Sequence, residues 1–264
     1  MATPTLTLNG FAEDPKGEGH RWVRTTQLAL GLHNLTSAIQ RQAMASVTGP
    51  PGTGKTSLLD LAEAAATVPV HRIEPSLSPT MLSITAQLLE ELTGDAGHGT
   101  RHARIPQLLT ALNAPCVVLV DEAQRLNQIT IDHLRFLHDH RDTNFALVFA
   151  GGEGCWNVLA KEPQLRRRIW RATFLTAHND DETVEIVRKL HPIWSAVIDA
   201  DLRWTYHRMP RADYALEHAA GGIIGNWVAL THSAIWQTDD PTDIDRAFLR
   251  NLLIQHGAPP RGLK

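Results

Sequence analysis

The chain has 264 residues, which allows one large domain or a medium-sized domain with a smaller one attached. Its 43% hydrophobic and 20% charged residues are typical of a soluble globular protein. The net charge of −3 excludes a globally basic surface, so any DNA contact must come from a local patch or from a weak patch repeated around an oligomer. Two cysteines are too few for a disulfide framework. No apolar run reaches the ~18 residues of a membrane span, and the polar N-terminal segment lacks the apolar region of a signal peptide. We therefore expect a cytoplasmic protein with no membrane partner.

Strand and helix patterns alternate through the first two thirds of the chain. Strands are predicted at 45–48, 68–73, 116–120 and 145–149. Helices are predicted at 28–39, 57–66, 79–92, 105–112, 129–138 and 156–160, with a Gly/His/Arg-rich loop at 94–104. This alternation indicates a parallel sheet covered by helices on both faces.

From about residue 180 the pattern is helical only, with helices expected at 182–190, 223–236 and 243–256. The change of pattern predicts a three-layer α/β core over residues 21–178 and a small all-α lid with a C-terminal tail over 179–264. Residues 1–20 are rich in Pro, Gly and charge without periodicity, which indicates a flexible N-terminal arm.

One segment between a predicted strand and a predicted helix has the residue types of a phosphate-binding loop. It fits G-x-x-x-x-G-K-[ST] with Gly49, Pro50, Pro51, Gly52, Thr53, Gly54, Lys55 and Thr56. Glycines let backbone N–H groups turn inward around phosphates, and Lys55 brings a positive charge to the β- and γ-phosphates. Thr56 offers a hydroxyl to Mg²⁺, and the helix that continues through Ser57 presents its positive N-terminus to the anion. We expect these residues to bind ATP with Mg²⁺; the alternative is a Gly/Pro loop with an accidental Gly-Lys-Thr.

A second candidate element ends the apolar run at 116–120. Asp121 follows this strand, which we expect to lie adjacent to the strand of the phosphate loop, so that its carboxylate reaches the Mg²⁺ shell. Glu122 comes next and can orient and deprotonate the water that attacks the γ-phosphate. The alternative is a strand that ends in a solvated turn.

Arginines cluster after the predicted helix at 156–160. Arg166 and Arg168 are candidates to cross a subunit boundary and contact the γ-phosphate bound to a neighbour. A solvated basic helix end is the other interpretation.

The chain resembles the AAA+ ATPases related to the TniB, TnsC and MuB transposition regulators in four stretches: V-T-G-P-P-G-T-G-K-T, V-V-L-V-D-E-A-Q-R-L, A-L-V-F-A-G-G and E-P-Q-L-R-R-R-I. Secretion ATPases of the ExeA type share the D-E-A-Q-x-L box. The segment from Gly221 to Leu230 is similar to the lid of TniB-like proteins. The resemblance covers about 25–256 and implies a P-loop NTPase fold of the AAA+ type. It also implies ATP-dependent ring or helical homo-oligomers on double-stranded DNA, which recruit a transposase and a target-selection protein, with the arginines at 166 and 168 acting in trans.

Two positions depart from this family pattern. Where members often carry a polar sensor residue after the last core strand, this chain has Gly151, Gly152 and Glu153. Where many lids carry an arginine after the G-N turn, it has Trp227 and Val228. Both departures suggest slow or partner-stimulated ATP hydrolysis, which suits a nucleotide-timed switch.

A DNA contact is predicted at Arg101 and Arg104, in the loop before the helix at 105–112, where several subunits of an assembly would each add a few phosphate contacts. A solvated basic loop is the competing interpretation. Two other functions stay open: an ATPase of another assembly, such as a secretion or helicase-loading factor, and a nucleotide-dependent signalling switch.

Overall fold

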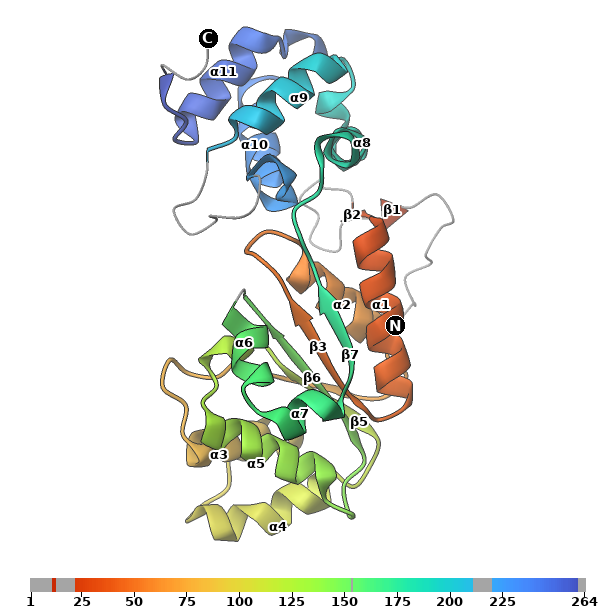
Figure 1. Ribbon diagram of the computed structural model, residues 1–264, viewed down its shortest axis with the longest axis vertical. Helices are drawn as coiled ribbons and strands as arrows, with labels where there is room; N and C mark the ends of the chain where they lie inside the picture. The colour runs from red at the N-terminus through yellow and green to blue at the C-terminus, as the bar shows by residue number, and fades with distance from the viewer. Residues whose placement is uncertain (1–10, 13–21, 153, 211–219, 261–264) are drawn as a thin grey trace. The chain divides into compact units, whose positions relative to one another are not determined.

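The computed structural model describes residues 11–12, 22–152, 154–210 and 220–260, and it divides into two compact units (Figure 1). The core unit comprises Gln27–Gly49 and Lys55–Leu175, and the lid unit comprises Met1–Thr26, Pro50–Gly54 and Thr176–Lys264. Most of the predicted N-terminal arm lies outside the described residues, and the predicted domain boundaries stay a prediction.

The core unit contains a five-stranded sheet in which all neighbouring strands are parallel. Its order is β4-β5-β6-β3-β7. The strands are β3 (Met44–Thr48), β4 (Val70–Ile73), β5 (Cys116–Val120), β6 (Phe145–Gly151) and β7 (Ile169–Phe174). Every residue of β3, β5 and β6 is buried, as expected for strands covered on both faces.

Two expectations about this sheet were wrong. The strand that ends before Asp121, β5, pairs with β4 and β6, so β6 separates it from the phosphate-loop strand β3. The sheet also has a further strand, β7, directly after the arginine cluster. It is an edge strand with largely exposed residues, and it therefore lacks the continuous apolar run that marks a central strand.

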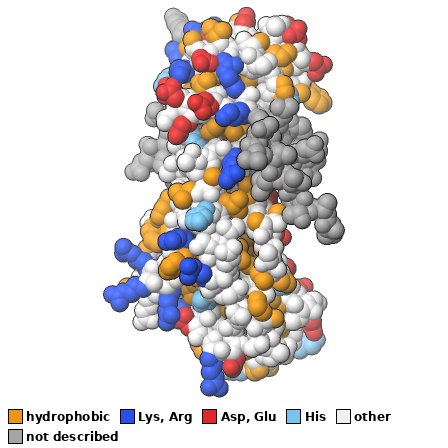
Figure 2. All heavy atoms as spheres, turned by 90° about the vertical axis from the view of Figure 1, so that its right-hand side faces the viewer, with side chains coloured by type: hydrophobic (Ala, Val, Ile, Leu, Met, Phe, Trp, Pro, Cys, Tyr) orange, Lys and Arg blue, Asp and Glu red, His pale blue; other side chains and the backbone are white. Residues whose placement is uncertain are grey.

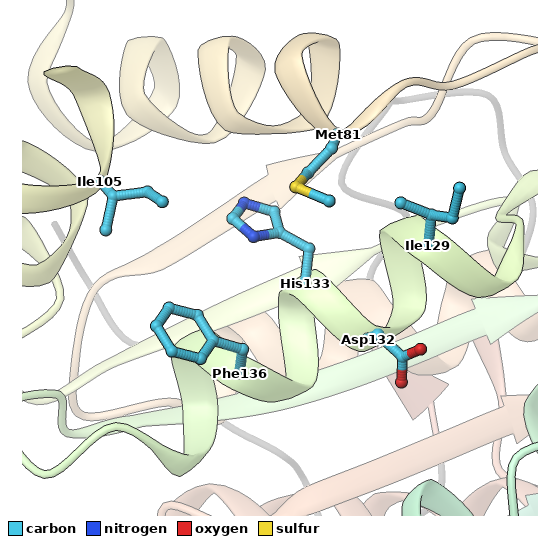
Figure 3. Close-up of a pocket in the computed structure, with 6 residues that line it drawn as sticks. All are labelled: Met81, Ile105, Ile129, Asp132, His133 and Phe136. Carbon is cyan, nitrogen blue, oxygen red and sulfur yellow. The ribbon is translucent and has the colours of Figure 1, made fainter. Parts of the chain in front are cut away.

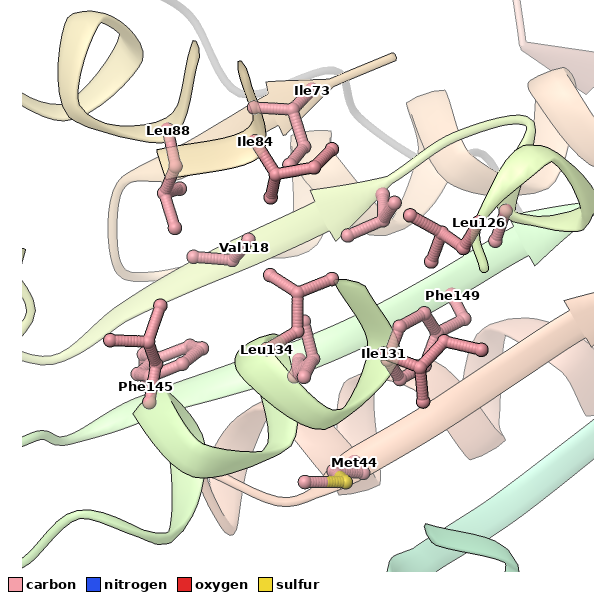
Figure 4. Close-up of a cluster of buried hydrophobic side chains, with 14 of the residues drawn as sticks. Met44, Ile73, Ile84, Leu88, Val118, Leu126, Ile131, Leu134, Phe145 and Phe149 are labelled. Carbon is pink, nitrogen blue, oxygen red and sulfur yellow. The ribbon is translucent and has the colours of Figure 1, made fainter. Parts of the chain in front are cut away.

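Helices cover both faces of the sheet, which confirms the predicted three-layer fold (Figure 1). The helices of the core unit are α1 (Thr26–Gln40), α2 (Lys55–Ala65), α3 (Met81–Thr93), α4 (Arg101–Ala111), α5 (Gln128–Asp139), α6 (Gly154–Ala160) and α7 (Pro163–Arg168). Alternate strand residues point to opposite faces. Val117 and Leu119 therefore pack in one cluster with α1 and α2, whereas Val118 and Val120 pack in another with α3 to α7 (Figure 4).

The lid unit is mainly helical, as predicted. It contains α8 (Asp180–Leu190), α9 (Asp199–Arg208), α10 (Ile224–Gln237) and α11 (Arg246–Gln255), with short 3-10 turns η2 (Pro192–Trp194), η3 (Ala220–Gly222) and η4 (Pro241–Asp243). A small antiparallel pair, β1 (Phe11–Ala12) and β2 (Trp22–Val23), accompanies them.

Two buried tryptophans form the centre of the lid core. Trp194 and Trp227 are fully buried and meet edge to face, with ring centroids 5.8 Å apart. Both indole N–H groups donate within the core, to the Thr231 hydroxyl at 2.9 Å and to the Gly221 carbonyl at 2.7 Å. Trp227 stands where the family resemblance led us to expect an arginine. Its buried ring and its hydrogen bond to Gly221 stabilise the lid core.

Candidate nucleotide site

The phosphate loop leaves the buried strand β3 and ends in the first turn of α2. Gly52 and Gly54 have φ values of 77° and 91°, in the left-handed region that favours glycine. The Thr53 hydroxyl donates to the Pro50 carbonyl at 2.8 Å and closes the turn. In the core unit, Lys55 Nζ donates to the Gly49 carbonyl at 2.8 Å. The lysine is thus folded back on the start of its own loop.

Within the lid unit, the loop residues meet the first turn of α10 and its N-cap residue Ile223. The Gly225 N–H donates to the Gly52 carbonyl at 2.9 Å. A Cβ on Gly225 would lie 2.7 Å from the Gly52 Cα, and a Cβ on Gly52 would lie 2.8 Å from Ile223 Cγ2. Glycine at both positions allows this close backbone approach.

Asp121 stands at the carboxyl end of β5, where it is tied to the neighbouring strand. Its N–H donates to the Ile73 carbonyl at 2.9 Å, and its Oδ1 accepts the N–H of Glu122 at 2.8 Å. Its Oδ2 accepts from the guanidinium of Arg72 on β4, which also lies 3.4 Å from Asp60. Burial lowers the pKa of Arg72, but the hydrogen bond and charge of Asp121, together with the charges of Asp60 and Glu63, raise it, so this pKa is raised overall.

The chemistry of these residues fits a magnesium ion. One carboxylate oxygen of Asp121 faces a cation already, the guanidinium of Arg72. Thr56, in the first turn of α2, carries the second oxygen of the predicted pair. Carboxylate and hydroxyl oxygens are ligands that Mg²⁺ accepts, alongside phosphate oxygens and water. Thr56 and Asp121 are therefore the residues that would hold it.

Glu122 follows Asp121 in a left-handed conformation, with φ of 52°. This conformation is uncommon for a residue with a side chain, and such residues cluster at functional sites. The Glu122 Oε2 accepts from the side-chain amide of Gln124 at 2.6 Å and lies 3.6 Å from the guanidinium of Arg125. The carboxylate is thus held in one place by two neighbours on the turn η1 (Ala123–Arg125).

Cys155 is a buried cysteine on α6, the helix that packs against the turn η1 after Glu122. This fully buried thiol on α6 has its pKa raised to about 12, chiefly by burial. The positive charge of Lys55 lowers this pKa, whereas the negative charges of Glu122 and Asp121 raise it. The charges of Lys55, Asp121 and Glu122 thus all influence the same thiol. Sequence reasoning gave no role to Cys155, because nothing in the motif spacing points to α6.

The candidate arginines lie on the short helix α7. Both are exposed, and Arg168 is 3.5 Å from Asp139 of α5. They stand between α6 and β7, at the surface of the core unit. Their action on a neighbouring subunit stays a prediction.

The two predicted DNA contacts differ from expectation in their local structure. Arg101 and Arg104 lie in the first turn of α4, because the helix begins at Arg101 and not at residue 105. Thr100 in an extended conformation precedes it, and Gly97 and Gly99 form the bend that allows an early start. The guanidinium of Arg104 donates to the Gly97 carbonyl at 2.9 Å and is partly buried, whereas the side chain of Arg101 lies outside what the structure describes. On the face shown in Figure 2, basic side chains are interspersed with acidic and apolar ones.

A cavity away from the candidate nucleotide residues lies among α3, α4 and α5 (Figure 3). It has a volume of about 430 Å³ and is lined by Met81, Ile105, Ile129, Asp132, His133 and Phe136. His133 is buried and its Nε2 lies 2.9 Å from the Thr85 hydroxyl, which explains it as a core residue. Over the described residues, no group of three or more His, Cys, Asp or Glu side chains could hold a metal, and no helix has the length and apolarity to cross a membrane.

Comparison with known proteins agrees with this fold. A family model described as an AAA domain matches residues 38–159. No curated protein sequence shows significant similarity to the chain. Among solved structures, ORC2 of Aeropyrum pernix in ADPNP and ADP complexes aligns with a TM-score of 0.59 at 18% identity, over 87% of this chain and 66% of that one.

Two further structures show the same likeness. RuvB of Thermotoga maritima aligns with a TM-score of 0.55 at 20% identity, over 89% of this chain and 69% of that one. Drosophila ORC bound to DNA aligns with a TM-score of 0.58 at 14% identity, over 90% and 67%. The chain thus spans about two thirds of the length of these proteins. The family model thus places an AAA domain in the core unit, and these solved structures share its fold.

Proposed function

We propose that this chain binds ATP with Mg²⁺ at the phosphate loop and hydrolyses it. The observation that carries this proposal is the glycine-rich loop between β3 and α2, in which Gly52 and Gly54 adopt left-handed conformations. Backbone N–H groups of Gly52, Thr53 and Gly54 and the N-terminus of α2 would hold the phosphates, with Lys55 adding its charge. Pro50 and Pro51, which have no N–H, would shape the loop. Ser57, in the same turn of α2, belongs to the proposed contacts.

Glu122 is the proposed general base. Its carboxylate is fixed by Gln124 and Arg125, and one of its oxygens, Oε2, takes both contacts. The other oxygen can accept the proton of a water aimed at the γ-phosphate. Bound Mg²⁺ supplies charge neutralisation on the phosphates, and most of the rate enhancement comes from positioning and electrostatics.

We propose further that the ATP-bound form assembles on duplex DNA and recruits a transposase, as the family resemblance implies. The Drosophila ORC structure, which has this fold, is bound to DNA, and this supports the DNA part of the proposal. In such an assembly Arg166 or Arg168 of one subunit would reach the ATP of the next. Arg166 is the better candidate, because Arg168 already faces Asp139.

Two substitutions test the nucleotide site. Lys55→Ala should lower the affinity for ATP and thereby prevent ATP-dependent assembly, measured by titration calorimetry and by light scattering. Glu122→Gln should retain ATP binding while turnover falls by about a hundredfold or more, which is the usual contribution of a general base. Normal turnover of Glu122→Gln would show that another group activates the water.

DNA binding is tested with a labelled duplex in the presence of ATP, ADP or neither, at rising salt. We expect binding that requires ATP and weakens steeply with salt, because phosphate contacts release counterions. Absent or ATP-independent binding would remove the transposition-type function. The likeness to ORC and RuvB favours a second candidate, an ATPase of another DNA-associated assembly; capture of a transposase by the ATP-locked Glu122→Gln protein would separate the two.

A further inference from the structure

The end of strand β6 is formed by Gly151 and Gly152, which have no side chains. The absence of side chains at these described residues leaves a space beside the backbone. The side chain of Gln124, which comes from the turn after β5, enters this space. Its Oε1 accepts the N–H of Gly152 at 2.9 Å.

The same amide holds the proposed base. Gln124 Nε2 donates to the Glu122 Oε2 at 2.6 Å, so one planar group bonds both the backbone at the end of β6 and the carboxylate at the end of β5. An amide can do this because it carries an acceptor on one side and donors on the other. The pairing fixes which way the amide points.

The absence of a side chain at Gly151 leaves room for the Gln124 amide. A Cβ there would lie 2.2 Å from the Gln124 Oε1 and 2.9 Å from the Cys155 Cβ, both closer than real contacts. Its φ is not in the left-handed region, so the backbone conformation does not require glycine. A Cβ at Gly152, in contrast, would meet the Gln124 amide at 3.7 Å, an ordinary contact. A side chain at 151 would therefore displace the Gln124 amide, whereas a Cβ at 152 would not.

We propose that Gln124 is a positioning residue that aligns Glu122 for hydrolysis and couples the base to the end of β6. This inference rests on the proposed function, in which Glu122 activates water. The chain that leaves Gly152 continues into α6 and α7, where Arg166 and Arg168 lie. A contact made by α7 with a neighbouring subunit can therefore reach Glu122 through the Gly152–Gln124 hydrogen bond.

Two replacements separate positioning from simple structural support. Gln124→Ala removes both hydrogen bonds. Gln124→Glu has nearly the same shape and can still accept from the Gly152 N–H, but it cannot donate to Glu122 and it repels that carboxylate. We expect both variants to lose tenfold or more in kcat at saturating ATP, because a misaligned base loses much of a contribution of 10²–10⁴. Affinity for a fluorescent ADP analogue and the thermal unfolding midpoint should stay near the values of the unsubstituted protein.

A matched control is Gln237→Ala in the lid unit, which removes a side-chain amide hydrogen bond of 3.0 Å to Gln255 on an exposed face. It should leave kcat unchanged. Wild-type kcat in Gln124→Glu would overturn the positioning role, because structural support alone would then suffice. Lost ADP affinity in both variants, in proportion to kcat, would also overturn it.

The outcome also separates this inference from the proposed function. If Glu122→Gln hydrolyses slowly but Gln124→Ala and Gln124→Glu hydrolyse normally, only the role of Gln124 fails. If Glu122→Gln itself hydrolyses at the normal rate, the base assignment fails, and the role of Gln124 fails with it.

Discussion

Replacing Arg72 by methionine should strengthen the effect of Mg²⁺ on nucleotide binding. The Arg72 guanidinium bonds the Asp121 oxygen on the side away from the Glu122 N–H, and it also pairs with Asp60. A metal held by Asp121 would therefore lie close to a fixed positive charge. Methionine keeps much of the apolar stem but removes this charge.

The size of the effect follows from exposure. Two unit charges 4 Å apart interact by about 4 kcal/mol at an effective dielectric constant of 20. The side chains of Arg72 and Asp121 are 34% and 20% exposed, so solvent screening reduces this strongly. We take about 1 kcal/mol for the repulsion removed, which corresponds to about a fivefold change in affinity.

The assay compares the dissociation constant of a fluorescent ATP analogue in Mg²⁺ with that in EDTA. The ratio of the two constants should increase about fivefold in Arg72→Met. Without nucleotide, the variant should lose about 1–2 kcal/mol of stability, because a partly buried carboxylate loses a charged partner. Arg188→Met is the matched control: Arg188 is 33% exposed and pairs with Asp199 in the lid unit. An unchanged ratio in Arg72→Met, or an equal change in Arg188→Met, would refute competition at Asp121.

Three further predictions concern the lid, the loop and the buried thiol. Trp227→Ala should destabilise the lid by about 3–5 kcal/mol because it opens a cavity beside Trp194, whereas Trp236→Ala, at a side chain 92% exposed, should change stability by about 0.5 kcal/mol or less; equal denaturation midpoints would contradict this. Gly52→Ala should lower the free energy of unfolding by about 1–2 kcal/mol, because a left-handed backbone costs a side chain about this much; unaltered stability would show that the loop relaxes. Cys155 should contribute to loss of stability at high pH: its pKa is raised from 9.0 to about 12 in the folded chain, so the unfolded chain releases this proton first and stability falls as pH rises from about 9. Denaturation at pH 8 and pH 10 should show a smaller fall in Cys155→Ala than in the unsubstituted protein, and equal falls would argue against the shift.

The order of the strands could not be obtained from the sequence. Alternation of strands and helices identifies a parallel sheet, but it does not say which strands are neighbours. The link from β3 to β4 passes through α2, and β4 lies at the far edge, with β5 and β6 inserted between them. Adjacency in the sheet depends on which side of it each crossover helix covers, and this is decided by packing among distant residues.

Edge and boundary elements were also harder to predict than central ones. Strand β7 has Trp170 and Phe174 about half exposed and Arg171 between them, so its pattern does not resemble a buried strand. For α4, Thr100 is a residue type that starts helices, but its side chain makes no capping hydrogen bond. Because Gly97 and Gly99 precede α4, the sequence indicated a loop as far as residue 104, whereas the helix begins at Arg101.

Candidate motif residues could be proposed from the sequence because the chemistry of phosphate binding fixes their spacing. Lys55 is separated from Gly49 by a turn whose shape depends on its own glycines, and Asp121 and Glu122 follow directly from a buried strand. Gln124 and Cys155 are different. Gln124 faces Gly152 only because β5 and β6 are neighbours in the sheet, and Cys155 lies on α6, which packs against the turn η1 that carries Gln124. No local pattern encodes such a meeting.

Gly151 shows how a residue can be misjudged when it is considered alone. In the sequence, a glycine where a polar sensor is expected suggests that a function has been lost. In the fold, the missing side chain leaves room for the amide of Gln124, which stands 2.2 Å from where a Cβ at residue 151 would be. The polar group is supplied by a different strand end, and it bonds Glu122 directly. A larger residue at 151 would displace the Gln124 amide from its present position and would also crowd Cys155. The two positions therefore constitute one feature of the site, and slow hydrolysis does not follow from the glycine by itself.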